Sequence, residues 1–269
     1  SLNKYKCNYC GRQIHYTGKC SKCGSTNLIH SGKGIERVEE ELKKYFDVPM
    51  VKVDSDLSKN KDNFSKIYKD FLNKKYSILI GTQIIAKGLH FPDVTLVGVI
   101  NSDIILNFPD FRSGEKTFQL LTQVSGRAGR AGKKGKVIIQ TYEPENNVIK
   151  DSKEENYELF YNREINSRKV FSYPPFSKIL NIGFSSEDEK RLIEVSREFY
   201  EEIKNQDIEL YGPMPSMVYK VQKRYRMNIF AKGSRAKIDM FKRYLKKKLD
   251  EFNDGKVRIV VDIDPINLM

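Results

Sequence analysis

Hydrophobic residues recur at helix spacing and at strand spacing along most of the chain, and this pattern predicts alternating helices and strands. Ile35, Val38 and Leu42 fall on one helix face, with glutamates early and lysines late, an order that suits the helix dipole. The other segments predicted before residue 150 are a strand at 48–53, a helix at 64–71, and strands at 78–80, 94–100 and 137–139. Short apolar runs between helices are typical of parallel strands covered on both faces, so we expect one α/β domain here.

A different order of elements follows a pair of prolines. Residues 153–168 predict a polar connecting helix, and Tyr173-Pro174-Pro175-Phe176 then breaks regular structure, because paired prolines continue neither a helix nor a central strand. The elements predicted beyond this break are a strand at 178–184, a helix at 187–204, a strand at 207–211, one or two strands within 217–231, a helix at 234–250 and a strand at 256–263. This β-α-β-β-α-β order is that of a ferredoxin-like α+β domain.

All four cysteines lie within the first 23 residues. Cys7 and Cys10 form one C-x2-C pair, Cys20 and Cys23 form a second pair after nine intervening residues, and a glycine follows each pair. Two such turns supply four thiolates for one tetrahedral zinc ion, which predicts a structural, zinc-ribbon-like module. The alternatives are two buried structural pairs, or competition for the metal by His15, a residue more typical of a solvated loop here.

The charge of the chain suggests a polyanionic partner. The 269 residues include 48 Lys and Arg against 35 Asp and Glu, a formal net charge of +13, and nucleic acid is the simplest partner for such a chain. A solubilising surface charge is the alternative. No apolar run reaches the roughly 18 residues of a membrane span and no signal peptide is recognised, so we expect a cytoplasmic protein without membrane contact. The first residue is Ser1 instead of Met, and we expect the chain to be a piece of a longer protein.

Basic residues are concentrated between residues 219 and 248. This stretch holds twelve Lys or Arg and a single acid, Asp239, with aromatic residues interleaved at strand spacing. Cations for phosphates beside rings for bases are typical of nucleic-acid surfaces. The alternative is a solvated helix face, with Phe230, Phe241 and Leu245 in the core. The residues favoured for DNA contact are Lys220, Lys223, Arg224 and Arg226.

The most specific segment of the chain is Gln123-Val124-Ser125-Gly126-Arg127-Ala128-Gly129-Arg130. On a helix, Gln123, Arg127 and Arg130 would share one face. Two guanidiniums on one face suit a phosphate chain, because each is always charged and offers forked donors, and they can neutralise charge on a transferring phosphoryl group. The alternative is two arginines on a solvated helix.

This octet resembles motif VI of superfamily 2 helicases, and residues 81–97, which begin Gly81-Thr82-Gln83, resemble motif V. In this form both are similar to the motifs of the primosomal protein N′ (PriA) helicases. The other stretches that match this family are Asp110-Phe111-Arg112, Thr117-Phe118-Gln119-Leu120-Leu121, Gln140-Thr141-Tyr142, Tyr173-Pro174-Pro175-Phe176 and the two cysteine pairs. The resemblance runs from about Cys7 to Phe176 and is weaker beyond it.

The resemblance implies an α/β fold in which a RecA-like second helicase lobe lies between the other two domains. The domains it implies are a zinc-binding module at 1–31, the helicase lobe at 32–172 and a DNA-binding α+β domain at 173–269. The roles it implies are contacts to the ATP γ-phosphate for Arg127 and Arg130, orientation of nucleotide or water for Gln123, a nucleotide contact for Gly88, and coupling of nucleotide state to the DNA backbone for Thr82 and Gln83. Lys87 is a candidate contact to DNA phosphate by its charge alone.

Some features of the family are absent from this chain. His90 stands where many helicases carry an acid, and Ile35 stands where the family has a threonine, so neither a carboxylate nor a hydroxyl role transfers. There is no G-x-x-x-x-G-K-[ST] segment and no Asp-Glu-x-His box. We therefore expect the phosphate cradle and the magnesium carboxylate to lie on a first lobe, and this chain alone to be inactive as an ATPase. The family usually carries four cysteine pairs and two zinc ions, which leaves open how the two pairs present here bind metal.

The function implied is that of an ATP-dependent 3′ to 5′ DNA helicase that restarts stalled replication forks and initiates primosome assembly. Its partners would be forked and single-stranded DNA, primosome proteins and single-stranded DNA-binding protein, with structural Zn²⁺ here and ATP and Mg²⁺ in the full-length protein. One alternative is a nucleic-acid-binding module without a motor role, against which motifs V and VI count. Another is a superfamily 2 helicase acting on RNA, which the cysteine pairs disfavour.

Overall fold

The computed structural model describes residues 4–6, 13–15, 34–53, 61–86, 90–126, 135–252 and 255–268. The chain divides into two compact units. Unit 1 comprises Ser1–Thr26, Pro109–Phe111 and Arg163–Met269, and unit 2 comprises Asn27–Phe108 and Arg112–Asn162. Each unit is described by itself below.

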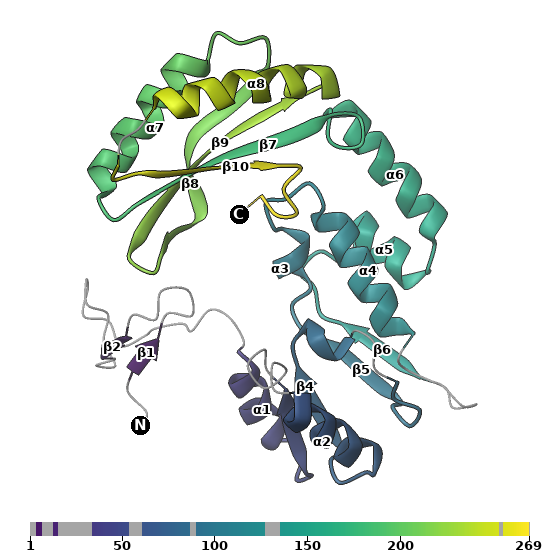
Figure 1. Ribbon diagram of the computed structural model, residues 1–269. Helices are drawn as coiled ribbons and strands as arrows, with labels where there is room; N and C mark the ends of the chain where they lie inside the picture. Colours follow the sequence, from purple (N-terminus) through teal and green to yellow (C-terminus); the bar gives the residue numbers. More distant parts are fainter. Residues whose placement is uncertain are drawn as a thin grey trace. The chain divides into compact units, whose positions relative to one another are not determined.

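Unit 2 contains parallel strands interleaved with helices (Figure 1). Its elements are α1 Ile35–Lys43, β3 Met50–Val53, α2 Lys61–Leu72, β4 Ile78–Gly81, the 3₁₀ helix η2 Gln83–Ala86, β5 Leu96–Val99, α3 Asp103–Leu106, α4 Ser113–Ser125, β6 Lys136–Ile139, α5 Asn147–Lys153 and the first part of α6 Tyr157–Val170. Strand β3 pairs with β4, and β5 pairs with β6, both in parallel. The parallel pairing predicted from the apolar runs is thus confirmed, although the described strands form two separate pairs.

The expectation that these strands are covered on both faces was wrong for β5 and β6. Along β5 and β6 exposed positions alternate with half-buried ones, and Leu96 and Ile138 are 58% and 49% exposed. The reason is the small number of layers in this part of unit 2: helix α4 contacts β5, and no other described helix is comparably close to this pair. A four-residue apolar run therefore need not be buried on both sides.

The helices of unit 2 are held by aromatic contacts. Phe118 of α4 stacks on Phe160 of α6 with ring centroids 4.2 Å apart. Phe91 is buried between Tyr68 and Phe71 of α2, which meet it edge-on at 5.5 and 5.4 Å. These contacts explain why the apolar face of α2 was recognisable in the sequence.

The connecting helix begins later than the sequence pattern predicted. The prediction was one helix over residues 153–168, whereas α5 ends at Lys153 and α6 begins at Tyr157. Glu155 lies between them in the left-handed region with φ of +52°, which stops the first helix. Asn156 then accepts a hydrogen bond from Leu159 N at 3.0 Å and so caps the second.

Unit 1 is built on a four-stranded antiparallel sheet in the order β10-β7-β9-β8. Its elements are the short hairpin β1 Lys4–Lys6 and β2 Gln13–His15, the end of α6, β7 Lys178–Ser186, α7 Glu189–Ile203, β8 Glu209–Val221, β9 Arg224–Gly233, α8 Arg235–Glu251 and β10 Arg258–Ile263. From β7 onward the predicted β-α-β-β-α-β order is confirmed. Strand β9 lies between the parallel strands β7 and β8, and β7 lies between β9 and β10.

The core of unit 1 lies on one face of this sheet. Figure 1 shows α7 and α8 together on that face, and both helices contact β7 and β9. The helices begin at Asp188 and Ser234, whose side chains accept from the backbone N–H of Arg191 and Lys237. The fully or almost fully buried side chains of this core are Leu180, Ile182, Phe184, Leu192, Val195, Phe199, Ile203, Met227, Ile229, Ala231, Ile238, Phe241, Leu245 and Val257.

Strand β8 is longer and less regular than predicted. The separate strands expected at 207–211 and at the start of 217–231 are one strand whose register to β9 shifts twice, between Tyr211 and Met214 and between Pro215 and Lys220. At the first shift Gly212 has φ of +113°, and a Cβ there would lie 2.7 Å from the carbonyl oxygen of Asn228. Both the dihedral angle and the close approach require glycine.

We predict that Gly212→Ala destabilises unit 1 by about 1–3 kcal/mol, because alanine would have to adopt a strained dihedral angle and push β9 away. Urea unfolding followed by circular dichroism measures this change. The matched control is Gly183→Ala in the same sheet, where a Cβ meets nothing closer than 3.6 Å. Equal unfolding midpoints for both variants would contradict the explanation.

Candidate nucleic-acid and nucleotide interface

Helix α4 places Gln123 on the surface of unit 2. The helix buries Thr117, Leu121 and Val124 and leaves Gln123 exposed. It ends at Ser125, whose hydroxyl donates to Glu155 at 2.6 Å. The helix face predicted to hold Gln123, Arg127 and Arg130 together is therefore described only as far as Gln123. Arg127 and Arg130 lie outside the described residues, and their roles stay predictions.

Thr82 and Gln83 lie at the carboxyl end of β4. Both are exposed, and Ile85 N donates to Thr82 O at 3.2 Å to close the turn that begins η2. Gly81, the last residue of β4, has to be glycine, because a Cβ there would lie 2.9 Å from the carbonyl oxygen of Val53 on the neighbouring strand. Exposed polar residues at the carboxyl end of a parallel strand are where α/β folds bind ligands. Lys87 and Gly88 lie outside the described residues.

A buried carboxylate that the sequence analysis missed joins the carboxyl ends of β5 and β6. Asp103 is 8% exposed, and its Oδ1 accepts from Thr141 Oγ1 at 2.7 Å. The backbone N–H of Tyr142 donates to both carboxylate oxygens at 3.2 Å. These bonds fix the Gln140-Thr141-Tyr142 stretch and leave the Tyr142 ring 90% exposed. The only local signal was an aspartate three residues after the apolar run 94–100.

The basic residues of the predicted DNA surface fall into two groups. The hairpin that joins β8 to β9 turns at Gln222 and Lys223, whose φ values are +46° and +73°. Two left-handed residues are typical of a type I′ turn, in which Asn-Gly is the usual pair. Lys220 and Lys223 are exposed on this hairpin, and Lys220 Nζ lies 3.8 Å from the centroid of the Tyr225 ring.

Arg224 and Arg226 are less available than these lysines. Both are half-buried, and the Arg224 guanidinium donates to the carbonyl oxygen of Ser185 on β7 at 2.8 Å. Tyr219 on the opposite strand donates to Glu189 at 2.9 Å, and burial together with this bond raises the pKa of its hydroxyl. The hairpin is therefore attached to β7 by Arg224 and presents its lysines.

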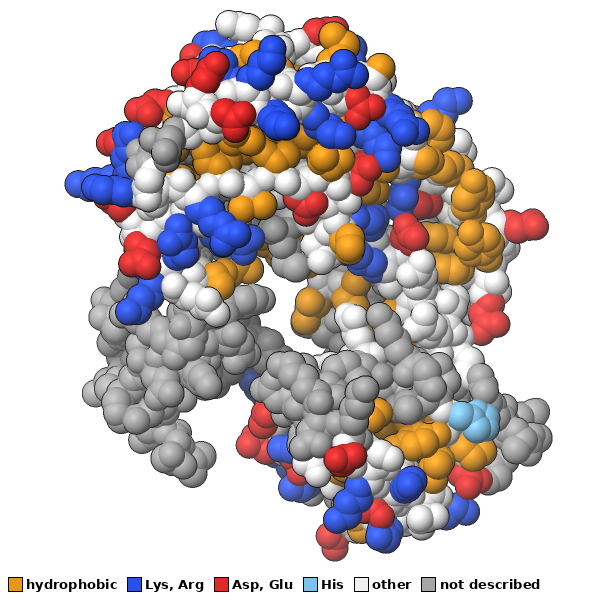
Figure 2. All heavy atoms as spheres, viewed as in Figure 1, with side chains coloured by type: hydrophobic (Ala, Val, Ile, Leu, Met, Phe, Trp, Pro, Cys, Tyr) orange, Lys and Arg blue, Asp and Glu red, His pale blue; other side chains and the backbone are white. Residues whose placement is uncertain are grey.

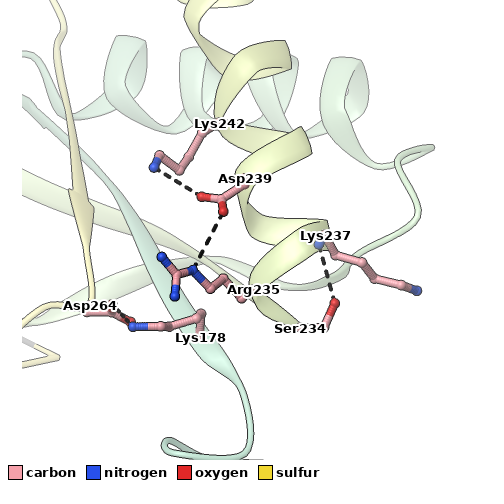
Figure 3. Close-up of polar contacts among 7 residues, drawn as sticks. All are labelled: Lys178, Ser234, Arg235, Lys237, Asp239, Lys242 and Asp264. Carbon is pink, nitrogen blue, oxygen red and sulfur yellow. Dashed lines mark hydrogen bonds and ion pairs between the residues drawn. The ribbon is translucent and has the colours of Figure 1, made fainter.

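Helix α8 carries the second group, and many of its cations are paired. Asp239 forms ion pairs with Arg235 and Lys242, as Figure 3 shows, and Lys242 Nζ lies 3.3 Å from Asp239 Oδ1. Lys237 pairs with Asp207 at 2.7 Å, and hydrogen bonds with Glu202 and Glu251 raise the pKa of Lys248. Figure 2 accordingly shows acidic side chains among the basic ones over the α8 side of unit 1.

The inner face of α8 is core. Phe241 and Leu245 are buried beneath the paired cations. The structure thus supports the alternative of core residues below a solvated basic surface for Phe241 and Leu245, whereas Phe230 is half-buried and lies outside this core. Arg243, Lys246 and Lys247 remain exposed on the outer face.

The cysteine residues lie outside the described residues. The antiparallel pairing of β1 with β2, with Lys6 opposite Gln13, brackets the segment that carries Cys7 and Cys10.

We predict that Asp103→Ala lowers the stability of unit 2 by about 1.5–3 kcal/mol, because three donor contacts to a buried carboxylate are lost. Thr141→Val keeps the shape of the side chain and removes only the 2.7 Å bond, so a smaller loss is expected. Thermal unfolding of the two variants and the parent chain measures both. A stability of Asp103→Ala equal to that of the parent would refute the role assigned to Asp103.

Two family models match the chain. The helicase conserved C-terminal domain matches residues 20–132, and the primosomal protein N C-terminal domain matches residues 169–266. No described helix has the length and apolar character needed to cross a membrane.

The chain is also similar to curated replication restart proteins. It is 38% identical to replication restart protein PriA of Bacillus subtilis over 272 residues, which cover 99% of this chain and 34% of that protein. It is 38% identical to PriA of Borreliella burgdorferi, with 99% of this chain and 41% of that protein covered. It is 33% identical to PriA of Haemophilus influenzae, with 99% of this chain and 37% of that protein covered. The chain thus spans about a third to two fifths of the length of these relatives.

Proposed function

Since the chain belongs to the PriA family, whose C-terminal region it matches, we propose that it is the helicase lobe and DNA-binding portion of a replication restart helicase. The observation that carries this proposal is the order of the two matches: a helicase C-terminal domain is followed directly by a primosomal C-terminal domain in one chain. The whole protein would unwind DNA 3′ to 5′ at stalled forks and recruit primosome proteins. Single-stranded DNA-binding protein would be a further partner.

In this proposal, unit 2 is the second RecA-like lobe of the motor. The parallel pairs β3–β4 and β5–β6 support it, as do the exposed Thr82 and Gln83 at a strand end. Arg127 and Arg130 would neutralise charge on the phosphates of ATP, with Gln123 and Gly88 beside the nucleotide. Bound ATP with Mg²⁺ would supply the phosphoryl group whose transfer drives the motor. Thr82, Gln83 and Lys87 would transmit nucleotide state to the DNA backbone.

We also propose that Cys7, Cys10, Cys20 and Cys23 hold structural zinc. Four thiolates suit a closed tetrahedral site, and the β1–β2 hairpin gives the first pair a frame. With no coordination position left open, this zinc would stabilise the module without taking part in catalysis.

We predict that the purified chain has no DNA-stimulated ATPase activity, because it contains neither a G-x-x-x-x-G-K-[ST] phosphate cradle nor an Asp-Glu-x-His box. A coupled assay of phosphate release, with and without forked DNA, measures this. Adding a separately expressed first lobe provides the positive control. DNA-stimulated turnover by the chain alone would overturn the assignment of the nucleotide-binding residues to a first lobe.

We predict that the β8–β9 hairpin is the main phosphate contact of unit 1. The double variant Lys220→Ala/Lys223→Ala is expected to weaken binding to labelled forked DNA by about 10- to 50-fold at 0.1 M salt, and to reduce the slope of log affinity against log salt by about 2. The charge-matched control is Lys246→Ala/Lys247→Ala on the outer face of α8. An equal loss in both double variants would mean that unit 1 attracts DNA by its net charge alone.

The same titration separates this proposal from a non-motor binding module. A preference for a fork over matched duplex and single strand that persists at moderate salt would mean that the chain recognises DNA structure. Equal binding that collapses with salt would mean a generic grip on phosphates.

A further inference from the structure

Among the described elements of unit 1, α7 and α8 both pack on one face of the four-stranded sheet, and the other face is contacted near Lys232 by Phe171 and Tyr173, which follow α6. Side chains alternate between the two faces of a strand. Leu180, Ile182 and Phe184 of β7 point into the core beneath α7 and α8, so Asn181 and Gly183 point to the opposite face. The same alternation applies to the neighbouring strands, whose core residues include Ile229 on β9 and Ile259 on β10. We name this opposite surface the open face.

The strand register places the side chains of the open face in rows. One row runs from Asp262 through Asn181 and Phe230 to Tyr211. The next row runs from Val260 through Gly183 and Asn228 to Met214. A third row runs from Arg258 through Ser185 to Arg226. The open face therefore has aromatic rings and amides at its centre and arginines at the end nearest the β8–β9 hairpin.

The centre of this face has an unused hydrogen-bonding group. Asn181 is 9% exposed, and its Oδ1 has no hydrogen-bond partner among the described residues. A buried polar atom without a partner costs free energy, so such atoms are rare in folded proteins and call for an explanation. A ligand that donates a hydrogen bond at this position would provide one.

The surface beside this amide carries no side chain at one position. Gly183 lies in the row beside Asn181, and a Cβ there would meet only Asn228 Oδ1 at 3.6 Å and Val260 O at 3.8 Å. The Tyr211 ring is 44% exposed, with Lys232 Nζ 5.3 Å from its centroid. A small residue flanked by rings and amides suits a planar group that stacks and hydrogen-bonds through its edge.

The charges on the face orient such a ligand. Arg258 and Arg226 lie at the hairpin end, whereas Asp262 and Glu209 lie at or beyond the aromatic row. Along β9 the four residue steps from Arg226 to Phe230 span about 13 Å. Phosphates are attracted to the first end; at the second end Asp262 repels them, whereas Glu209 is paired with Lys232 at 3.2 Å. A strand with its backbone over the arginines would place bases over Asn181 and Phe230.

We propose that the open face binds the bases of single-stranded DNA. Unpaired bases offer both a stacking surface and a free edge, which duplex DNA hides. This inference deepens the proposed function and rests on DNA as the partner of unit 1, but it assigns the contact to a different surface from the hairpin. The hairpin grips phosphates of any strand, and the open face distinguishes a strand with exposed bases.

The test uses the purified chain and two fluorescent probes of equal charge, a twelve-nucleotide oligothymidine and the same backbone without bases. The parent chain is expected to bind the first about tenfold or more tightly than the second, by fluorescence anisotropy. Gly183→Leu adds a side chain to the face at a position where a Cβ makes only ordinary van der Waals contacts, and is expected to abolish this preference while leaving affinity for the abasic probe unchanged.

Two further variants guard against loss of folding and against effects elsewhere. Tyr211→Ala changes a 44% exposed ring and is expected to reduce the preference, and Gly98→Leu on β5 of unit 2 is the matched control. The hairpin variant Lys220→Ala/Lys223→Ala should weaken both probes equally.

The outcomes separate the two proposals. Equal binding of the two probes by the parent chain overturns the open-face site and leaves the hairpin proposal intact. A preference that survives both Gly183→Leu and Tyr211→Ala also overturns it, since the bases are then read elsewhere. Failure to bind any DNA overturns the proposed DNA-binding function itself.

Discussion

The arrangement of unit 1 depends on one constraint, which is that two helices can cover only one face of a four-stranded sheet. Leu180, Ile182 and Phe184 of β7 point into the core under α7 and α8. The strand register then determines which side chains of each neighbouring strand lie on the opposite face. The open face carries amides, arginines and partly exposed rings beside the exposed Val260 and Met214. Its chemistry is a consequence of where the core lies.

The sequence pattern was sufficient to predict the helices and strands whose apolar face is continuous. The β-α-β-β-α-β order was predictable because α7 and α8 alternate buried and solvated positions clearly, and each begins at a capping residue, Asp188 or Ser234. The division of residues 217–231 was not predictable, because Gln222 and Lys223 form a left-handed turn without the Asn-Gly pair that usually marks one. Local preference was overridden there by the pairing of the flanking strands.

The residue types of the candidate site were predictable from the sequence, whereas the partners that surround each residue were not. The lysines of the hairpin and of α8 are equivalent in a count of charges, yet Lys248 is paired with Glu202 on α7 whereas Lys220 and Lys223 are exposed on a turn. Partners tens of residues away in sequence decide which cations are available, and no local pattern reveals them. Asp103 was missed for the same reason, since its donors lie 38 and 39 residues further along the chain.

The two proposed DNA contacts of unit 1 share strand β9, and this sets the distance between them. Lys223 precedes β9, and Phe230 lies near its far end, seven residues and about 23 Å away. Neither contact alone separates a fork from other DNA, because phosphates occur on every strand and unpaired bases occur on any single strand. Joined by one strand of a packed sheet, they require phosphates and exposed bases at a fixed separation. A duplex meeting a single strand offers that combination, so selectivity for branched DNA would follow from the rigidity of β9.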